Sequence, residues 1–543
     1  MAHNEEGSDL SSPGRNATER VLNTPELLRA VFDVLEPGLR PCPGTDADNE
    51  QFRLHRATLA ACARVSLFVS QHALDVLWRA IDEIEWLLKV LPTVDYVQRQ
   101  GIPTLTGDIS ASAWAHFQTF AVRIRRLTFL QRNEDMPTWT ELVRKCPGQP
   151  LLPNLRYLHA MWVADEIAIS PIHNLLPPCL HIIHIGFCGR VSNEAERLLF
   201  EALVNGAPQL ETLSWGTYFP SDFPPTYPTY LHGIGRHFPK LATLTWTTRT
   251  PQNPVANITL LRAISAMPSL RTLRLDINFP EPENLTFPPS AFESLHTLHL
   301  TGHSFRDVVE FVHSLRPPAL KALFLAGKHG PLTLPTLHGG ISRLSANLPS
   351  TLTHFSLFAC YRSEPPPQSI EKTTGICDIL APLLRFNDLE HVVLDPEMSS
   401  VLQPTDDDLA SAGAAWPRLQ SLNLFTHNHP ADTTGPEIAA NIHITVQGVV
   451  TLAQRCPQLS ALSIPAFGVF SPRIPHGSVV QMTPFVKHPL RYFRIGMLNP
   501  GEKLPSQLAA VLRRMFPLFA DPAARYTHGQ EPRPRRFVMT VPE

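Results

Sequence analysis

A short segment that recurs through most of the chain is the strongest constraint on its fold. Its pattern is a proline, one variable residue, a leucine, two variable residues, then two apolar residues separated by one position, as at Pro208, Pro239 and Pro268. The copies follow one another at intervals of about 25 to 40 residues, a period typical of solenoid proteins. The first apolar residue of each further copy is Ile124, Leu155, Leu180, Leu295, Leu320, Leu352, Leu389, Leu419, Leu459 or Leu490.

The end of each copy predicts a short strand, because leucines two positions apart lie on one face of an extended chain. Amphipathic helical patterns lie between the copies, at residues 193–207, 257–267, 305–315 and 446–455. Strands that alternate with helices predict a parallel sheet, and therefore an α/β solenoid whose inner face is lined by strands. The uneven spacing favours a curved and irregular stack. A final helix over residues 504–515 is expected to cap it.

The composition excludes several classes of protein. The chain has 543 residues, of which 43% are hydrophobic and 17% charged, and its net charge is −2. That balance gives no bulk attraction to nucleic acid or to anionic lipid. No apolar run is long enough to span a membrane, and the polar N-terminus has no apolar signal core. We therefore expect a cytoplasmic or nuclear protein, and the scattered cysteines are expected to be reduced thiols.

The region ahead of the repeats is expected to be helical. Thr24, Pro25 and Glu26 form a helix start, with a capping hydroxyl, a proline at the first position and an acid in the first turn. Further helices are expected over residues 54–69 and 71–91. The predicted organisation is a disordered tail (1–18), a helical domain (19–92), the solenoid (93–500), and a capping helix with a tail (501–543).

The helical domain resembles an F-box, and the whole chain resembles the fungal type of F-box plus leucine-rich-repeat protein. The residues that carry the resemblance are Pro25-Glu26-Leu27-Leu28, Val31-Phe32, Leu35, Ala63, Val65, Phe68 and Ala73-Leu74-Asp75-Val76-Leu77-Trp78-Arg79. The chain departs from the family pattern at Asn23-Thr24, where a leucine is usual, and at Phe68, where tryptophan is common. Its loop from Pro37 to Phe52 is also longer than is typical.

The resemblance implies a substrate-recognition subunit of a Skp-cullin-F-box ubiquitin ligase. The F-box-like region would bind the Skp adaptor and, through it, a cullin-RING ligase, while the repeats hold a protein target. The protein itself would catalyse nothing and need no cofactor. The alternative is a ligase-independent interaction scaffold. The residues expected to bind the adaptor are Leu22, Pro25, Leu28, Val31, Phe32, Leu35, Val65 and Trp78, although an apolar stripe of this kind can also simply form the core of the helical domain.

Known catalytic motifs are missing from the sequence, which has no GxSxG, P-loop or HExxH pattern. His181 with His184, and His427 with His429, lack further ligands at a recognised metal spacing. The remaining candidates are residues that point away from the core on the predicted strands. Aromatic residues and arginine are the usual anchors of protein interfaces. The residues expected to bind the target are therefore Tyr157, Arg274, Phe324, Tyr492 and Arg494.

Overall fold

The structure is a computed structural model of the whole chain, which divides into two compact units, residues 1–221 and 222–543. Several features named in the sequence analysis lie outside the described residues: Leu22, the tail 1–18, His427, His429 and the side chain of Arg494. The described residues are 24–37, 46–97, 102–105, 107–130, 136–163, 169–187, 191–217, 233–248, 258–277, 286–327, 334–359, 379–396, 404–424, 444–464, 488–495 and 512–518.

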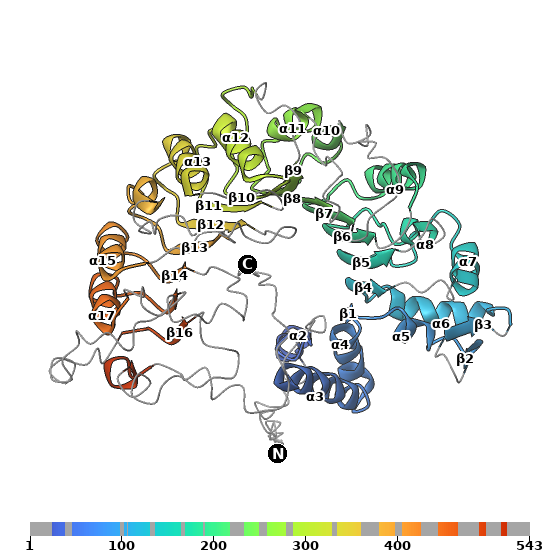
Figure 1. The fold of residues 1–543 in the computed structure, drawn as a ribbon. Helices are drawn as coiled ribbons and strands as arrows, with labels where there is room; N and C mark the ends of the chain where they lie inside the picture. Colours follow the sequence, from blue (N-terminus) through green and yellow to red (C-terminus); the bar gives the residue numbers. More distant parts are fainter. Residues whose placement is uncertain are drawn as a thin grey trace, which may run out of the picture. The chain divides into compact units, whose positions relative to one another are not determined.

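The first unit opens with helices α2 (Pro25–Asp33), α3 (Asp46–Cys62) and α4 (Leu67–Leu77), shown in dark blue in Figure 1. The predicted helix over residues 54–69 is wrong at its end, because a turn separates α3 from α4. The hydroxyl of Ser66 accepts a hydrogen bond from the amide of Val69 at 3.2 Å and so starts a new helix.

The predicted helix over residues 71–91 is wrong beyond Leu77. The chain forms strand β1 (Ala80–Ile81) and the short helix α5 (Glu85–Leu88) instead. Strand β1 pairs in parallel with β4 (Arg126–Leu130), so the sheet of the repeats starts ahead of the expected boundary at residue 92. Ala80 and Ile81 are fully buried apolar residues, which a helical periodicity alone does not separate from a strand.

The sheet of the first unit is parallel throughout and has the strand order β1-β4-β5-β6-β7. The helices that connect its strands include α9 (Asn193–Gly206), which the sequence predicts. An antiparallel pair, β2 (Val94–Val97) with β3 (Ile102–Leu105), stands apart from this sheet. The other elements are β5 (Tyr157–Val163), β6 (Ile182–Phe187), β7 (Thr212–Thr217), α6 (Ala111–Ala121), α7 (Met136–Lys145) and α8 (Ile169–His173).

The second unit repeats the same plan, with consecutive strands β8 to β16 paired in chain order in one sheet. Its strands line the inner side of a curve and its helices cover the outer side (Figure 1). The strands are β8 (Thr243–Thr248), β9 (Thr272–Ile277), β10 (Thr297–Gly302), β11 (Ala322–Gly327), β12 (His354–Ala359), β13 (His391–Pro396), β14 (Ser421–Leu424), β15 (Ala461–Ile464) and β16 (Tyr492–Ile495). The helices are α10 (Ile234–His237), α11 (Ile258–Ser265), α12 (Phe305–Leu315), α13 (Leu334–Asn347), η4 (Ala381–Leu383), α15 (Asp406–Ala415) and α17 (Val446–Arg455).

The register of the strands confirms the leucine-rich-repeat α/β solenoid. Equivalent leucines of successive copies pair with one another, as Leu273, Leu298 and Leu323 do across β9, β10 and β11. All three are fully buried, whereas the residues between the leucines of β10 are partly exposed. Each copy therefore adds one layer to a continuous apolar core beneath the strands. Of the predicted capping helix at the C-terminal end, residues 512–515 are described and are helical.

Candidate interaction surfaces

Helix α2 has two apolar sides, and only one of them is available to a partner. Leu28 and Phe32 are 2% and 4% exposed, and they form a core with Leu59, Ala73 and Val76. Their expected place in an exposed stripe is therefore wrong, because α2 needs this side to pack against α4. The other side is exposed and carries an apolar stripe of its own: Leu27 (48%), Val31 (50%) and Val34 (78%).

This stripe, defined here by Leu27, Val31 and Val34, includes one predicted adaptor residue and two that the sequence reasoning missed. Residues four and three positions apart lie on one face of a helix, so the signal was present in the sequence. It was hidden because the neighbouring Leu28-Phe32-Leu35 pattern has the same spacing. Among the other predicted residues, Pro25 is exposed and Leu35 is packed partly against the core.

A second exposed apolar group lies at the turn between α3 and α4. Val65, one of the residues expected to bind the adaptor, is 73% exposed, and its neighbours Leu67 and Phe68 are 82% and 41% exposed. The ring of Phe68 forms a T-shaped contact with the ring of His72, with centroids 5.2 Å apart. The helical region thus presents apolar side chains from α2 and from this turn.

Trp78 lies between the helical region and the first repeats. Its ring packs against Phe120 of α6, with centroids 4.8 Å apart. The side chain is only partly exposed. Trp78 therefore joins two parts of the first unit, and most of its surface is not available for an adaptor.

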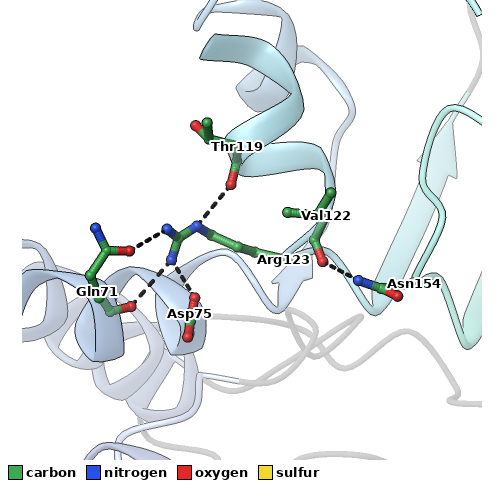
Figure 2. Close-up of polar contacts among 6 residues, drawn as sticks. All are labelled: Gln71, Asp75, Thr119, Val122, Arg123 and Asn154. Carbon is green, nitrogen blue, oxygen red and sulfur yellow. Dashed lines mark hydrogen bonds and ion pairs between the residues drawn. The ribbon is translucent and has the colours of Figure 1, made fainter. Parts of the chain in front are cut away.

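Arg123 makes polar contacts at the same boundary between the helical region and the first repeats, as Figure 2 shows. Its guanidinium forms an ion pair with Asp75 and donates to the backbone oxygen of Gln71 at 3.2 Å. It also donates to the side-chain oxygen of Gln71 at 2.7 Å and to the backbone oxygen of Thr119 at 2.9 Å. One side chain from the end of α6 thus binds α4 through several polar groups.

Arg79 makes the second polar connection. Its guanidinium lies 2.7 Å from Asp33 and 2.7 Å from Glu36, at the end of α2. Its backbone oxygen accepts hydrogen bonds from the amides of Arg125 and Arg126, both at 2.9 Å. The residue before strand β1 therefore holds α2 with its side chain and the next strand with its main chain.

The inner face of the first unit carries an aromatic cluster. The guanidinium of Arg126 lies 5.5 Å from the centre of the Tyr157 ring, and that ring is 5.5 Å from His184. His159 completes the cluster at 5.5 Å from His184. Burial lowers the pKa of His159, and burial together with the nearby His159 lowers the pKa of His184 to about 4. Both imidazoles are uncharged at neutral pH.

The predicted target-binding residues of the second unit differ in how accessible they are. Arg274, His299 and Phe324 stand side by side on β9, β10 and β11. Arg274 is exposed, but Phe324 is only 9% exposed. Phe324 is therefore poorly placed to anchor a partner. Tyr492 on β16 is 41% exposed.

The described part of the chain holds no group of three or more His, Cys, Asp and Glu side chains that could bind a metal ion. His181 instead contacts Glu211 at 3.1 Å. None of the described helices is long and apolar enough to cross a membrane.

Comparisons with known proteins place this chain far from them. No protein-family model and no curated protein matches it. Among solved structures, it is similar to the crystal structure of the Rad7 and Elc1 complex in yeast, with a TM-score of 0.37 and 11% sequence identity over 88% of this chain and 94% of that chain. This similarity is too distant to bear on function, and the fold assignment rests on the strand register of the chain itself.

Proposed function

We propose that the chain is a substrate receptor of a Skp-cullin-F-box ubiquitin ligase. The observation that carries the proposal is the exposed stripe of Leu27, Val31 and Val34, on a helix whose opposite side already forms a core. The sequence of this region resembles an F-box, whose role is to bind a Skp-type adaptor. A stripe of this kind fits a helix or groove of a partner.

The size of the exposed apolar surface supports a partner. Fully burying a Val, Leu or Phe side chain is worth roughly 1.5–3 kcal/mol, and the exposed fraction of each of these side chains leaves part of that to a partner. The stripe on α2 and the group of Val65, Leu67 and Phe68 at the α3–α4 turn provide several such side chains on one small helical region. Exposed apolar groups gathered in this way are typical of interaction sites.

The connections through Arg79 and Arg123 support a positioning role. A ligase receptor has to hold its target near the site of ubiquitin transfer, since proximity raises the effective concentration. Arg79 attaches α2 to the start of β4, and Arg123 attaches α4 to the end of α6, by ion pairs and hydrogen bonds. In the proposed role the chain positions a target protein and performs no chemistry itself.

Co-purification with a Skp-type adaptor tests the proposal. We expect the intact chain to retain the adaptor, and the double variant Val31→Asp with Val34→Asp to lose it, because two charges would have to be buried in the interface. The matched control is Leu198→Asp on α9, which is also exposed, at 45%, but lies outside the helical region. The proposal fails if the intact chain does not bind, or if the double variant binds as well as the control.

The alternative is a ligase-independent scaffold in which the helical region only caps the sheet. The contacts of Arg79 favour it, because they hold α2 against the first edge of the sheet. Deleting residues 1–77 leaves β1 in place and separates the two functions. A scaffold cap should lower the melting temperature of the repeats when it is removed. A receptor should keep folded repeats and lose the adaptor.

A further inference from the structure

The residues directly before the strands of the first unit form a strand-start row: Arg79, Arg125, Arg156, His181 and Glu211. The main chain aligns them. The amide of Arg156 donates to the backbone oxygen of Arg125 at 2.8 Å, and the amide of His181 donates to that of Arg156 at 2.9 Å. Neighbouring members are therefore about one strand spacing apart, roughly 4.8 Å. Arginines occupy its first three places.

Positive charge in this row is only partly neutralised. Asp33 and Glu36 pair with Arg79, and His181 contacts Glu211 at 3.1 Å. Burial lowers the pKa of Arg125, and the charges of Arg79, Arg156 and Arg29 lower it further, against Asp75 alone. Cations that repel one another in this way gain from a bound anion.

Two more arginines, Arg29 and Arg126, join Arg125 and Arg156 of the row in an arginine patch, which is defined by these four residues and leaves out the paired Arg79. Arg126 follows Arg125 and lies over the Tyr157 ring. Arg29 lies on α2 one turn before Asp33, which contacts Arg79. None of these four guanidiniums pairs with a carboxylate in the part of the chain that the structure describes.

The ends of the patch limit the length of a ligand. Asp33, Glu36 and Asp75 lie on the side of the helical region, and Glu211 is the last member of the row. A long polyanion such as a nucleic acid strand would run from the patch into these carboxylates. A short anionic group meets only the arginines, and the planar guanidinium binds phosphate or carboxylate through two parallel hydrogen bonds.

We propose that the arginine patch binds a short anionic segment of the target protein, carrying a phosphorylated side chain or clustered carboxylates. This inference rests on the proposed function, since it names the chemistry of the target. The apolar stripe of α2 and Arg29 point to different sides of that helix, because positions 27, 31 and 34 share one face and positions 29 and 33 share another. Adaptor and target can therefore bind together.

Fluorescence polarisation with the full chain tests the proposal. The probe is a labelled peptide with Asp-phosphoserine-Asp between glycines. We expect saturable binding that weakens with added salt, and a loss of about tenfold or more in affinity in the double variant Arg125→Gln with Arg156→Gln. The matched control is Arg271→Gln with Lys321→Gln, two exposed cations at equivalent places before β9 and β11 of the second unit. We expect this control to bind like the unaltered chain.

Three further probes identify the source of the anion. A peptide with glutamate in place of phosphoserine that binds equally well would assign clustered carboxylates, and weaker binding would assign a phosphate group. The patch is not the site if a neutral Asn-Ser-Asn peptide binds as tightly, if the control variant loses as much affinity, or if the unaltered chain shows no saturable binding at low salt. Arginine-dependent binding of an oligothymidine of equal affinity would replace the proposal with a nucleic-acid site.

Adaptor binding by the same variants separates this proposal from the proposed function. Arg125→Gln with Arg156→Gln should still co-purify with the Skp-type adaptor. Val31→Asp with Val34→Asp should lose the adaptor and still bind the peptide. Equal melting temperatures for these variants and the intact chain would show that a loss of binding is not a loss of fold.

Discussion

The ring of His299 on β10 stacks on the ring of Phe324 on β11, with centroids 4.0 Å apart and planes inclined by 2°. Strand pairing places Arg274 on the other side of His299. The burial that results, together with the charge of Arg274, lowers the pKa of His299 to about 4. Although His299 lies on the expected binding face, its ring thus packs against neighbouring side chains of the sheet.

Stability should fall as the pH drops from about 6.5 to 4, in part because of His299. The unfolded chain binds a proton at this imidazole in that range and the folded chain does not, so acid favours unfolding. We expect His299→Phe, which keeps a stacking ring and cannot be protonated, to be more stable than the unaltered chain by about 2 kcal/mol at pH 5. Thermal unfolding at pH 8 and pH 5 measures the difference.

The control for this experiment is His338→Phe on α13, where the side chain is exposed. It should leave the difference between the two pH values unchanged. An equal gain at pH 8 and pH 5 in His299→Phe would mean that ring packing, and not protonation, is responsible.

Phe32 and Val31 are adjacent in sequence and should differ in how much their truncation lowers stability. Phe32→Ala should destabilise the helical region by about 3–5 kcal/mol, because it opens a cavity against Leu59 and Val76. Val31→Ala removes exposed surface and should change the stability by less than about 0.5 kcal/mol. Urea unfolding followed through hydrogen exchange of α2 to α4 measures both. Similar losses in the two variants would contradict the assignment of the two sides of α2.

Replacing Arg79 with glutamine should loosen the attachment of α2. Asp33 and Glu36 would lose their partner, and we expect a cost of about 1–2 kcal/mol, since both carboxylates are partly exposed. Hydrogen exchange should become faster in α2 than in the strands. Arg64→Gln, at an exposed position after α3, is the matched control and should have no effect. Unchanged exchange in Arg79→Gln would show that apolar packing alone holds α2.

Gly448 on α17 is a position where a single added methyl group should be poorly tolerated. Its added Cβ would come 2.7 Å from Cγ of Asp406, whose carboxylate accepts hydrogen bonds from the amide of Thr445 at 2.7 Å and from its hydroxyl at 2.6 Å. Gly448→Ala should therefore destabilise the second unit by about 1–3 kcal/mol. Denaturant unfolding is the measurement.

The matched control for Gly448 is Gly339→Ala on α13, where no atom lies within 4 Å of an added Cβ. It should stabilise the second unit by roughly 0.5–1 kcal/mol through helix propensity. If Asp406→Ala combined with Gly448→Ala costs the full sum of the two single losses, the steric contact is not the cause.

The strands of the repeats were the most predictable part of the molecule. Each predicted copy corresponds to an observed strand, from Ile124 before β4 to Leu490 before β16. The reason is local: alternating apolar residues are stable as a strand only with one face buried, and each copy repeats that solution. The start of helix α15 has a similarly local cause, since Thr405 and Asp408 form a capping box within a few residues.

The helical region was less predictable, because its pattern admits more than one arrangement. Leu28 and Val31 both belong to apolar stripes of α2, and only packing against α4 selects Leu28 for the core. In the same way, Ala80 and Ile81 continue the apolar pattern of α4 but form strand β1, because β4 offers them hydrogen bonds. Such choices depend on residues far along the chain.

The repeat pattern of the chain is thus sufficient to predict a parallel, strand-lined α/β solenoid and the residues that face away from its core. Tertiary contacts alone reveal which of those residues remain accessible: Phe324 stacks on His299 and is largely buried. They also reveal which side of α2 is open to a partner. They also bring Arg29 close to Arg125 and Arg156, three positions that no sequence spacing connects. The physical reason is that periodicity determines which face of an element is apolar, whereas exposure and charge depend on what the fold packs against it.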